Sequence, residues 1–488
     1  MREEILRMEH ICCMDEGVLE LDYLNMQIFK GEIYGILELE NYGVSKLIEL
    51  ICRNTHLENG QVFFDEKRVN SARESDGSKN KATVIGRRSR LIDSLSLADN
   101  LFVLREGFHR YVIPERAVRV EAERVLREVG IRLSARTRAG KLSRYHRLVL
   151  EVMKAVIAGS KLIILWDISD MLSAEELPQF HRLLRKMTEK GNTFLYIYGH
   201  HEVLRQVCDR IAVFKEQKIQ KVLSDQDMLR EQIVNVYARY AYDKLLRLSR
   251  DTQNEICGND VIRLEQVCYG HIRNLSFSVS AGENVLLLDR SNTIIDELSD
   301  LLVGEEEPGS GRILPMLPRK ERKKRIVLIK RDAVCSTLFP ELSYLENLCS
   351  PLAEKVPLFW QKSKFKKSVF HEYREKIGPV IEADNLYGLS QKDLLTLVYY
   401  RYLIARPELV ICVQPLSNMD MHLRSHVLEL MAELRNSGIA VLMLNTELYD
   451  TFYIANKLIQ VEHGTITKEY TKAHFDEARR IQEDIFPD

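Results

Sequence analysis

The sequence has no long hydrophobic run, no excess of either charge and no C-x-x-C cysteine pair. Its longest aliphatic runs, such as residues 162–165 and 285–288, fall far short of the roughly 20 residues that span a bilayer. The 70 basic and 71 acidic residues give a net charge of −1, which does not favour nucleic acid as a partner. Nine cysteines without a C-x-x-C pair favour reduced thiols over disulfides or zinc. Residues 1–7 include acids and lack the apolar core of a signal peptide, so we predict a cytoplasmic protein.

What the sequence does contain is an internal duplication. Residues 95–101 (LSLADNL) recur as residues 342–348 (LSYLENL), and Leu142-Ser143 recurs as Leu389-Ser390. Both pairs have an offset of 247, which is 342 minus 95 and 389 minus 142. A fixed offset at independent points predicts two copies of one fold. Apolar periodicity is lost between the copies, which predicts a first domain at 1–242, a linker at 243–258, a second domain at 259–470 and a C-terminal tail at 471–488.

Each half has the same predicted order of elements. Alternating apolar and polar residues at 5–28 and 261–279 predict antiparallel strands. Solid apolar strands at 33–37 and 285–288 come next, each followed by a loop and a helix with apolar residues at i, i+3, i+4 and i+7. Charged helical segments, a further helix and more apolar strands complete each half. Solid apolar strands between helices predict an α/β fold with a parallel sheet covered on both faces.

This order resembles the nucleotide-binding domain of the ATP-binding-cassette (ABC) family. Two such domains in one chain resemble the tandem ATPase subunits of ribose-, galactose- and xylose-type sugar importers. Local support comes from the Leu-Ser at each helix start, from residues 59–65 (NGQVFFD) and from residues 209–213 (DRIAV). The resemblance implies two tandem domains, each with a P-loop-like parallel sheet core, an antiparallel β subdomain and a helical subdomain. It also implies ATP and Mg²⁺ as ligands and membrane permease subunits as partners.

The segments that match the family's phosphate-binding loop, G-x-x-x-x-G-K-[ST], keep few of its residues. In that loop backbone N–H groups wrap the phosphates, the lysine reaches phosphate oxygens and the hydroxyl binds Mg²⁺. The family positions hold Glu38, Gly43, Val44 and Ser45 in the first half, and Asp289, Ile294, Ile295 and Asp296 in the second. Only Gly43 and Ser45 match. A helix N-terminus still attracts anions, but carboxylates at Glu38 and Asp289 would either repel a triphosphate or fill the anion site themselves.

Two further family motifs are altered. The glutamine that senses Mg²⁺ and couples to the permease corresponds to Arg87 in the first half and to Arg331 in the second. The signature motif, which contacts the γ-phosphate of the opposite domain, keeps only its Leu-Ser, at Ser143 and Ser390. Both serines also suit helix N-caps, a role that needs no nucleotide.

The motif that activates water is also altered. The family's glutamate, which polarises the attacking water, corresponds to Asp167 and to Gln414, and an amide side chain cannot act as a base. The switch histidine falls on Gly199, with His200 next to it, and on Thr446. We therefore name Asp167 and His200 as the candidate catalytic residues and assign no metal ligand.

Basic residues form two runs. Residues 319–325 (RKERKKR) predict a solvated connection between strands, with nucleic acid or anionic lipid as the alternative contact. Residues 87–90 (RRSR) fall in the loop that, by the resemblance, faces the permease, although an ordinary exposed loop explains them too.

No composite site keeps a full set of motif residues, and loss of one such group typically slows catalysis by about 10²–10³-fold. We therefore predict an ABC-transporter ATP-binding-subunit-like protein of the sugar-importer type that has lost hydrolysis. Its role would be structural or regulatory, at a permease on the inner face of the membrane or beside an active ABC subunit, with its halves paired to each other or as a homodimer. Two alternatives stay open: a divergent but active ATP-hydrolysing subunit, and a soluble scaffold or regulator unconnected with transport.

Overall fold

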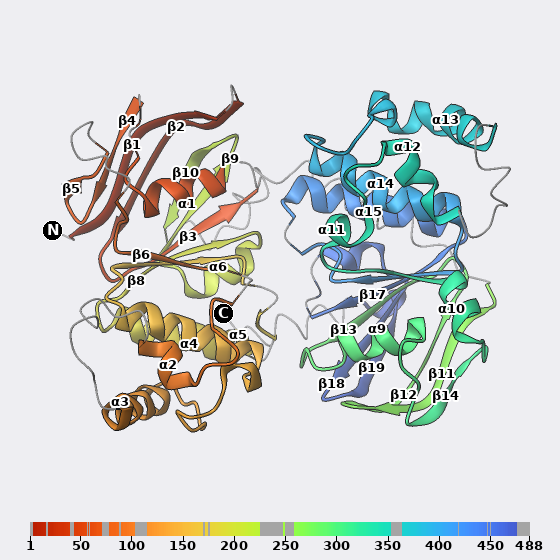
Figure 1. The fold of residues 1–488 in the computed structure, drawn as a ribbon, viewed down its shortest axis with the longest axis horizontal. Coiled ribbons are helices and arrows are strands. Elements are labelled where there is room, and N and C mark those ends of the chain that lie inside the picture. The colour runs from red at the N-terminus through yellow and green to blue at the C-terminus, as the bar shows by residue number, and fades with distance from the viewer. Residues whose placement is uncertain are drawn as a thin grey trace. The chain divides into compact units, whose positions relative to one another are not determined.

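The chain divides into two compact units, which a computed structural model describes in detail (Figure 1). One unit comprises Met1–Ala238, and the other comprises Arg239–Ser417 with His422–Asp488. The structure describes residues 3–15, 18–39, 43–55, 57, 59–70, 78–86, 89–102, 115–168, 171–173, 176–224, 247–248, 258–352, 364–417, 419–446, 448 and 450–475. Most of the predicted linker at 243–258, and the tail beyond residue 475, therefore lie outside the described residues.

The first unit contains two sheets and a group of helices. An antiparallel sheet has the order β2 (Val18–Phe29), β1 (Glu4–Asp15), β4 (Asn59–Phe64), β5 (Lys67–Arg68). The core sheet has the order β10 (Lys218–Ser224), β9 (Arg210–Lys215), β3 (Ile33–Glu38), β8 (Thr193–Tyr198), β7 (Leu162–Trp166), β6 (Ala82–Ile85). Its strands pair in parallel except for the β9–β10 hairpin. The helices are α1 (Val44–Cys52), α2 (Leu97–Phe102), α3 (Glu115–Glu128), α4 (Arg144–Ile157), α5 (Glu176–Thr188) and α6 (His201–Val207).

The second unit repeats this plan. Its antiparallel sheet has the order β12 (Ile272–Ser280), β11 (Asp260–Tyr269), β14 (Ser310–Leu314). Its core sheet has the order β15 (Ile326–Ile329), β16 (Leu409–Val413), β17 (Ala440–Asn445), β13 (Asn284–Asp289), β18 (Lys457–Glu462), β19 (Thr465–Thr471). The helices are α9 (Ile295–Val303), α10 (Arg319–Arg325), α11 (Ala333–Thr337), α12 (Tyr344–Cys349), α13 (Lys364–Ile377), α14 (Gln391–Ala405) and α15 (Met421–Asn436).

One helix in each unit packs between the two sheets. In the first unit α1 contacts β2, β4 and β6, and one apolar cluster joins residues of both sheets to this helix (Figure 1). In the second unit α9 shares a corresponding cluster with both of that unit's sheets. The inner strands β3 and β13 are buried at every position because both faces of the core sheet are covered. The predicted α/β class, with parallel-core sheets and antiparallel β subdomains, is confirmed.

A loop before the first short helix of each helical subdomain has the same internal support in both units. In the first unit the buried Asn100 side chain accepts a hydrogen bond from the N–H of Ile92 at 2.8 Å and donates to the carbonyls of Ile92, Leu95 and Ser96. In the second unit Asn347 does the same with Phe339, Leu342 and Ser343. Ile92 and Phe339 remain exposed at the tips of these loops.

The basic run at 319–325 connects two strands and is mostly exposed, as predicted, and it forms the helix α10. Arg322 is buried and donates to the carbonyl of Leu301 at 3.3 Å, while Lys323 and Arg325 pair with Glu305 and Glu408. Part of this charge is therefore already neutralised within the unit. Across the part of the chain that the structure describes, no helix combines the length and the hydrophobicity that crossing a membrane requires.

Candidate functional site

The family positions that directly follow core strands lie at one edge of each core sheet. Strands β3, β8 and β7 are parallel neighbours, so the residues that follow them emerge at the same edge. Strands β13, β17 and β16 are arranged in the same way in the second unit. This is the edge where open α/β sheets bind ligands, because the loops between strand ends and helix N-termini meet there.

In the second unit a carboxylate fills the turn between β13 and α9. Asp289 ends the strand and is fully buried. One of its oxygens accepts hydrogen bonds from the backbone N–H groups of Thr293 at 2.7 Å and Ile294 at 2.8 Å, and the other accepts from Ser291 at 3.2 Å. Burial raises the pKa of Asp289, while the backbone N–H groups around it act in the opposite direction. The N–H groups of this turn therefore bind an anion that belongs to the chain itself.

The remaining positions of this turn carry no phosphate-binding chemistry. Ile294 and Ile295 are buried in the apolar cluster, at the places of the family's glycine and lysine. Asp296 stands at the place of the magnesium-binding hydroxyl, and its carboxylate lies 3.9 Å from the guanidinium of Arg331. Arg331 itself occupies the place of the magnesium-sensing glutamine, so two positions that the family uses around a cation form an ion pair here.

The two remaining family positions of the second unit also contact each other. The Gln414 side-chain N–H donates to the hydroxyl of Thr446 at 3.2 Å, and both residues are buried. Gln414 follows β16 and has a φ of 44°. Its backbone N–H donates to the carbonyl of Leu444 on β17 at 2.9 Å. Neither an amide nor a threonine hydroxyl takes a proton from water at neutral pH, so this pair provides no general base.

The phosphate-loop segment of the first unit keeps more of the family's motif residues than that of the second unit. Gly43 precedes α1 with a φ of 87°, and a Cβ at this position would clash with the carbonyl oxygen of Glu20. Val44, at the lysine position, is fully buried, whereas Ser45 is exposed in the first turn of the helix. Glu38 is buried at the end of β3. A glycine and a hydroxyl are therefore present at this helix start, but the lysine is replaced by a core residue.

Asp167 lies in the same backbone geometry as Gln414. It follows β7 with a φ of 47°, and its N–H donates to the carbonyl of Ile197 on β8 at 3.2 Å. Left-handed backbone costs a non-glycine residue about 1–3 kcal/mol and persists where the surrounding structure imposes it. His200 directly precedes α6, and its ring lies 5.9 Å from that of Tyr198. The strand-end geometry is thus kept in both units, but only the first unit has a carboxylate there.

The signature serines act as helix caps. The hydroxyl of Ser143 accepts from the N–H of His146 at 3.3 Å at the start of α4. Ser390 accepts from the N–H of Asp393 at 3.2 Å at the start of α14. The N-cap role predicted from the sequence is confirmed for both. Arg87 lies outside the described residues.

The sequence located these positions but did not reveal their pairings. Asp296 with Arg331, and Gln414 with Thr446, are separated by more than thirty residues and come from different elements. The only sequence feature that pointed to these pairings was that, in the family, both members of each pair contact the same bound ligand.

Comparison with known proteins shows what the chain is similar to. Residues 21–167 match a family model described as ABC transporter. A solved structure described as RNase-L Inhibitor is 14% identical, with a TM-score of 0.60 over 98% of this chain and 93% of that one, which supports the fold alone. The fold is that of two tandem ABC nucleotide-binding-type domains.

The similarity extends to importer proteins over nearly the whole length of the chain. A Ribose import ATP-binding protein of Rubrobacter xylanophilus is 23% identical over 478 residues, which cover 95% of this chain and 95% of that protein. A Ribose import ATP-binding protein of Caldanaerobacter subterraneus is 21% identical over 483 residues, which cover 96% of this chain and 97% of that protein. The resemblance inferred from motif order is therefore confirmed.

Proposed function

We propose that this chain, with cassette domains at 1–242 and 259–470, is a sugar-importer-type ABC subunit that does not hydrolyse ATP. Its role would be structural or regulatory, at a permease or beside an active ABC subunit. One observation carries the proposal: the backbone N–H groups of the second unit's phosphate-loop turn are bonded to Asp289. A triphosphate would have to displace a covalently attached carboxylate that is already in place.

The second unit does not fit Mg²⁺ and ATP. The turn has no lysine to neutralise phosphate charge, and Arg331 lies next to Asp296 at the place where a cation would be held. Gln414 and Thr446 bond to each other and offer no base. Since phosphoryl transfer relies on positioning and electrostatic stabilisation, loss of these groups together removes the sources of catalysis.

The first unit supports the alternative of a divergent active enzyme. Asp167 occupies the strand-end geometry of the family's catalytic carboxylate, and Gly43 and Ser45 are retained at the start of α1. The buried Val44 argues against this alternative, because no cation replaces the lysine at that place. Asp167 therefore decides between the two proposals.

The first experiment measures nucleotide binding and turnover. Calorimetry of Mg-ATP against the purified full chain should give no binding tighter than about 10 µM, which corresponds to about −7 kcal/mol. Phosphate release should not exceed the background of a matched preparation. Turnover that disappears in Asp167→Asn but persists in Asp384→Asn, an exposed carboxylate away from the strand-end loops, would establish the active-enzyme alternative instead.

The second experiment tests the partner. The loops supported by Asn100 and Asn347 keep the same hydrogen bonds in both units, and they adjoin the segment that the family resemblance places against the permease. We therefore propose a permease or an active ABC subunit as the partner, and the inner face of the membrane as the location. Copurification of the tagged chain from membranes with such a subunit, and loss of it in Phe339→Asp, is the expected result. Recovery from the soluble fraction alone would favour a scaffold unconnected with transport.

A further inference from the structure

A cavity of about 240 Å³ lies in the first unit between α3, α4 and α5. Its inner wall is apolar and includes the buried side chains of Val125, Met153 and Met187. An apolar cavity of about 150 Å³ is large enough to bind benzene. This cavity therefore has room for a substituted aromatic ring, and methionine sulfurs make favourable contacts with such rings.

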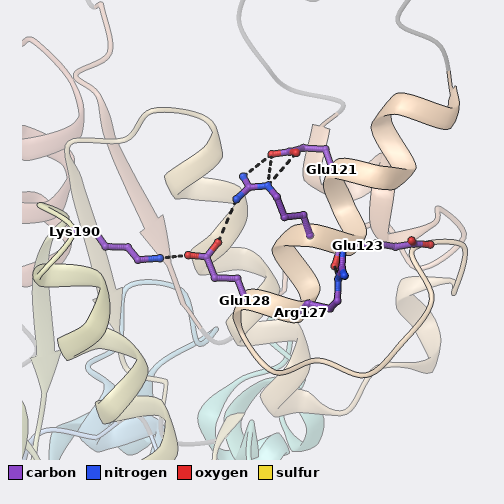
Figure 2. A network of polar contacts seen from close by, with 6 residues as sticks. Glu121, Glu123, Arg127, Glu128 and Lys190 are labelled. Atoms are coloured by element: carbon purple, nitrogen blue, oxygen red, sulfur yellow. Dashed lines mark hydrogen bonds and ion pairs between the residues drawn. The ribbon is translucent and has the colours of Figure 1, made fainter.

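The rim of the cavity is charged and carries an ion-pair network (Figure 2). Arg124 lies between two carboxylates of its own helix, 2.6 Å from Glu121 and 3.8 Å from Glu128. Figure 2 shows Glu121, Glu128 and Lys190 in this network. Lys190, just beyond α5, pairs with Glu128 across the rim, and Lys186 is exposed beside it. The rim thus holds three cations and two acids. Exposed pairs of this kind contribute little stability, so a carboxylate of a ligand can replace Glu128 at Lys190.

The second unit fills the corresponding space with its own side chains. Val125 stands five residues before Gly130, and Tyr373 stands five residues before Gly378. Met153 stands ten residues after the capping serine of α4, and Tyr400 stands ten residues after that of α14. The Tyr373 and Tyr400 rings pack edge to face, with centroids 5.8 Å apart. By these correspondences in sequence, two packed aromatic rings stand at the positions that Val125 and Met153 hold in the first unit.

The charge at one position of the rim is reversed between the units. Lys186 stands five residues before Gly191, and Glu433 stands five residues before Gly438. Burial, followed by the neighbouring Glu433 carboxylate, raises the pKa of Tyr400 in the second unit. In the second unit the phenol of Tyr400 lies near the carboxylate of Glu433, whereas the first unit has the cation Lys186 at the position that corresponds to Glu433. A ring that enters the first unit is better matched if it carries an anionic group.

We propose that the cavity of the first unit binds a small aromatic carboxylate. The ring lies between Val125 and Met153, and the carboxylate lies at Lys186 and Lys190. This inference does not depend on the state of the ATP site, because the cavity reaches Asn192, just before β8, whereas the family positions follow the other ends of the core strands.

The test uses phenylacetate and its neutral analogue phenylacetamide with the full chain, by ligand-observed NMR and calorimetry. Phenylacetate should bind with a Kd on the order of 0.1–1 mM. The Val125→Tyr/Met153→Tyr variant, which carries the residues of the second unit, should lose binding of both compounds at least tenfold. Lys186→Glu, a surface change that leaves the apolar wall intact, should weaken phenylacetate at least fivefold and leave phenylacetamide unchanged. Lys67→Glu is the control for general charge.

Two results would overturn the proposal. One is no binding of phenylacetate by the unmodified chain at 10 mM. The other is binding that survives both Lys186→Glu and the double tyrosine variant, which would place the compound elsewhere. If the double variant does not fold, the contrast between phenylacetate and phenylacetamide in Lys186→Glu still decides the matter.

Discussion

Replacing Asp289 tests whether its carboxylate holds the turn between β13 and α9. In Asp289→Ala three backbone N–H groups lose their acceptor. A hydrogen bond to a charged group contributes about 1.5–3 kcal/mol, and water entering the turn recovers part of this, so we expect a local loss of about 3 kcal/mol. This corresponds to roughly a hundredfold faster amide exchange. Asp289→Asn, which keeps one acceptor oxygen and the same shape, should lose about half as much.

The assay is hydrogen exchange of peptides spanning residues 290–298 in the full chain, which reports local opening without a two-state assumption for two units. Inorganic phosphate at 10 mM, compared with chloride of equal ionic strength, should restore protection in Asp289→Ala. If phosphate binds with a Kd of about 1 mM, it stabilises the turn by about 1.4 kcal/mol, or tenfold in exchange. The unmodified chain should not respond. Unchanged exchange in Asp289→Ala, or equal phosphate protection in the unmodified chain, would refute the reasoning.

Further predictions concern stability. Burial lowers the pKa of His181 to about 4, so between pH 6.5 and 4 the unfolded chain takes up a proton that the folded chain does not. The free energy of unfolding should therefore fall by about 3 kcal/mol as the pH drops through this window. His181→Phe should remove that slope in pH-dependent unfolding. Gly43→Ala should lower the free energy of unfolding by about 1–3 kcal/mol, because Gly43 has a positive φ and a Cβ there clashes with the Glu20 carbonyl. Gly191→Ala is the control: its φ is also positive but the space around it is open, so thermal unfolding should show a loss of about 1 kcal/mol. Asn347→Ala should lose about 3 kcal/mol and raise proteolysis near Phe339, and an unchanged cleavage rate would contradict its anchoring role.

Much of the fold was predictable from the sequence, because periodicity is a local property. The solid apolar runs of β3 and β13 require burial on both faces, and the alternation of β1 and β2 requires one sheltered face. Because the two halves repeat at an offset of 247, an element predicted in one half could be compared with the corresponding element in the other. The helix α10 was missed because seven residues with six cations look solvated, and nothing local signals that Arg322 reaches the carbonyl of Leu301.

The site was predictable in position but not in contacts. The sequence placed Asp289 at the phosphate turn, since strand, loop and helix follow in order. Whether its carboxylate repels a phosphate or replaces it depends on where the N–H groups of Thr293 and Ile294 point, which is a matter of backbone geometry. The cavity beside Val125 could not be predicted from the sequence for a similar reason. Small side chains on three separate helices leave a cavity only where these helices pack together.

The carboxylate at the β13–α9 turn has a kinetic consequence as well as an energetic one. A diffusible ligand occupies its site to an extent set by its concentration, and it dissociates at a finite rate. The Asp289 carboxylate is covalently attached to the chain just before its donors, so its occupancy depends on no concentration and it cannot dissociate from the protein. If the proposed function holds, the conformation of this turn in the second unit would not respond to cellular nucleotide, phosphate or magnesium levels. A turn that cannot exchange its anion has no bound and empty states to alternate between.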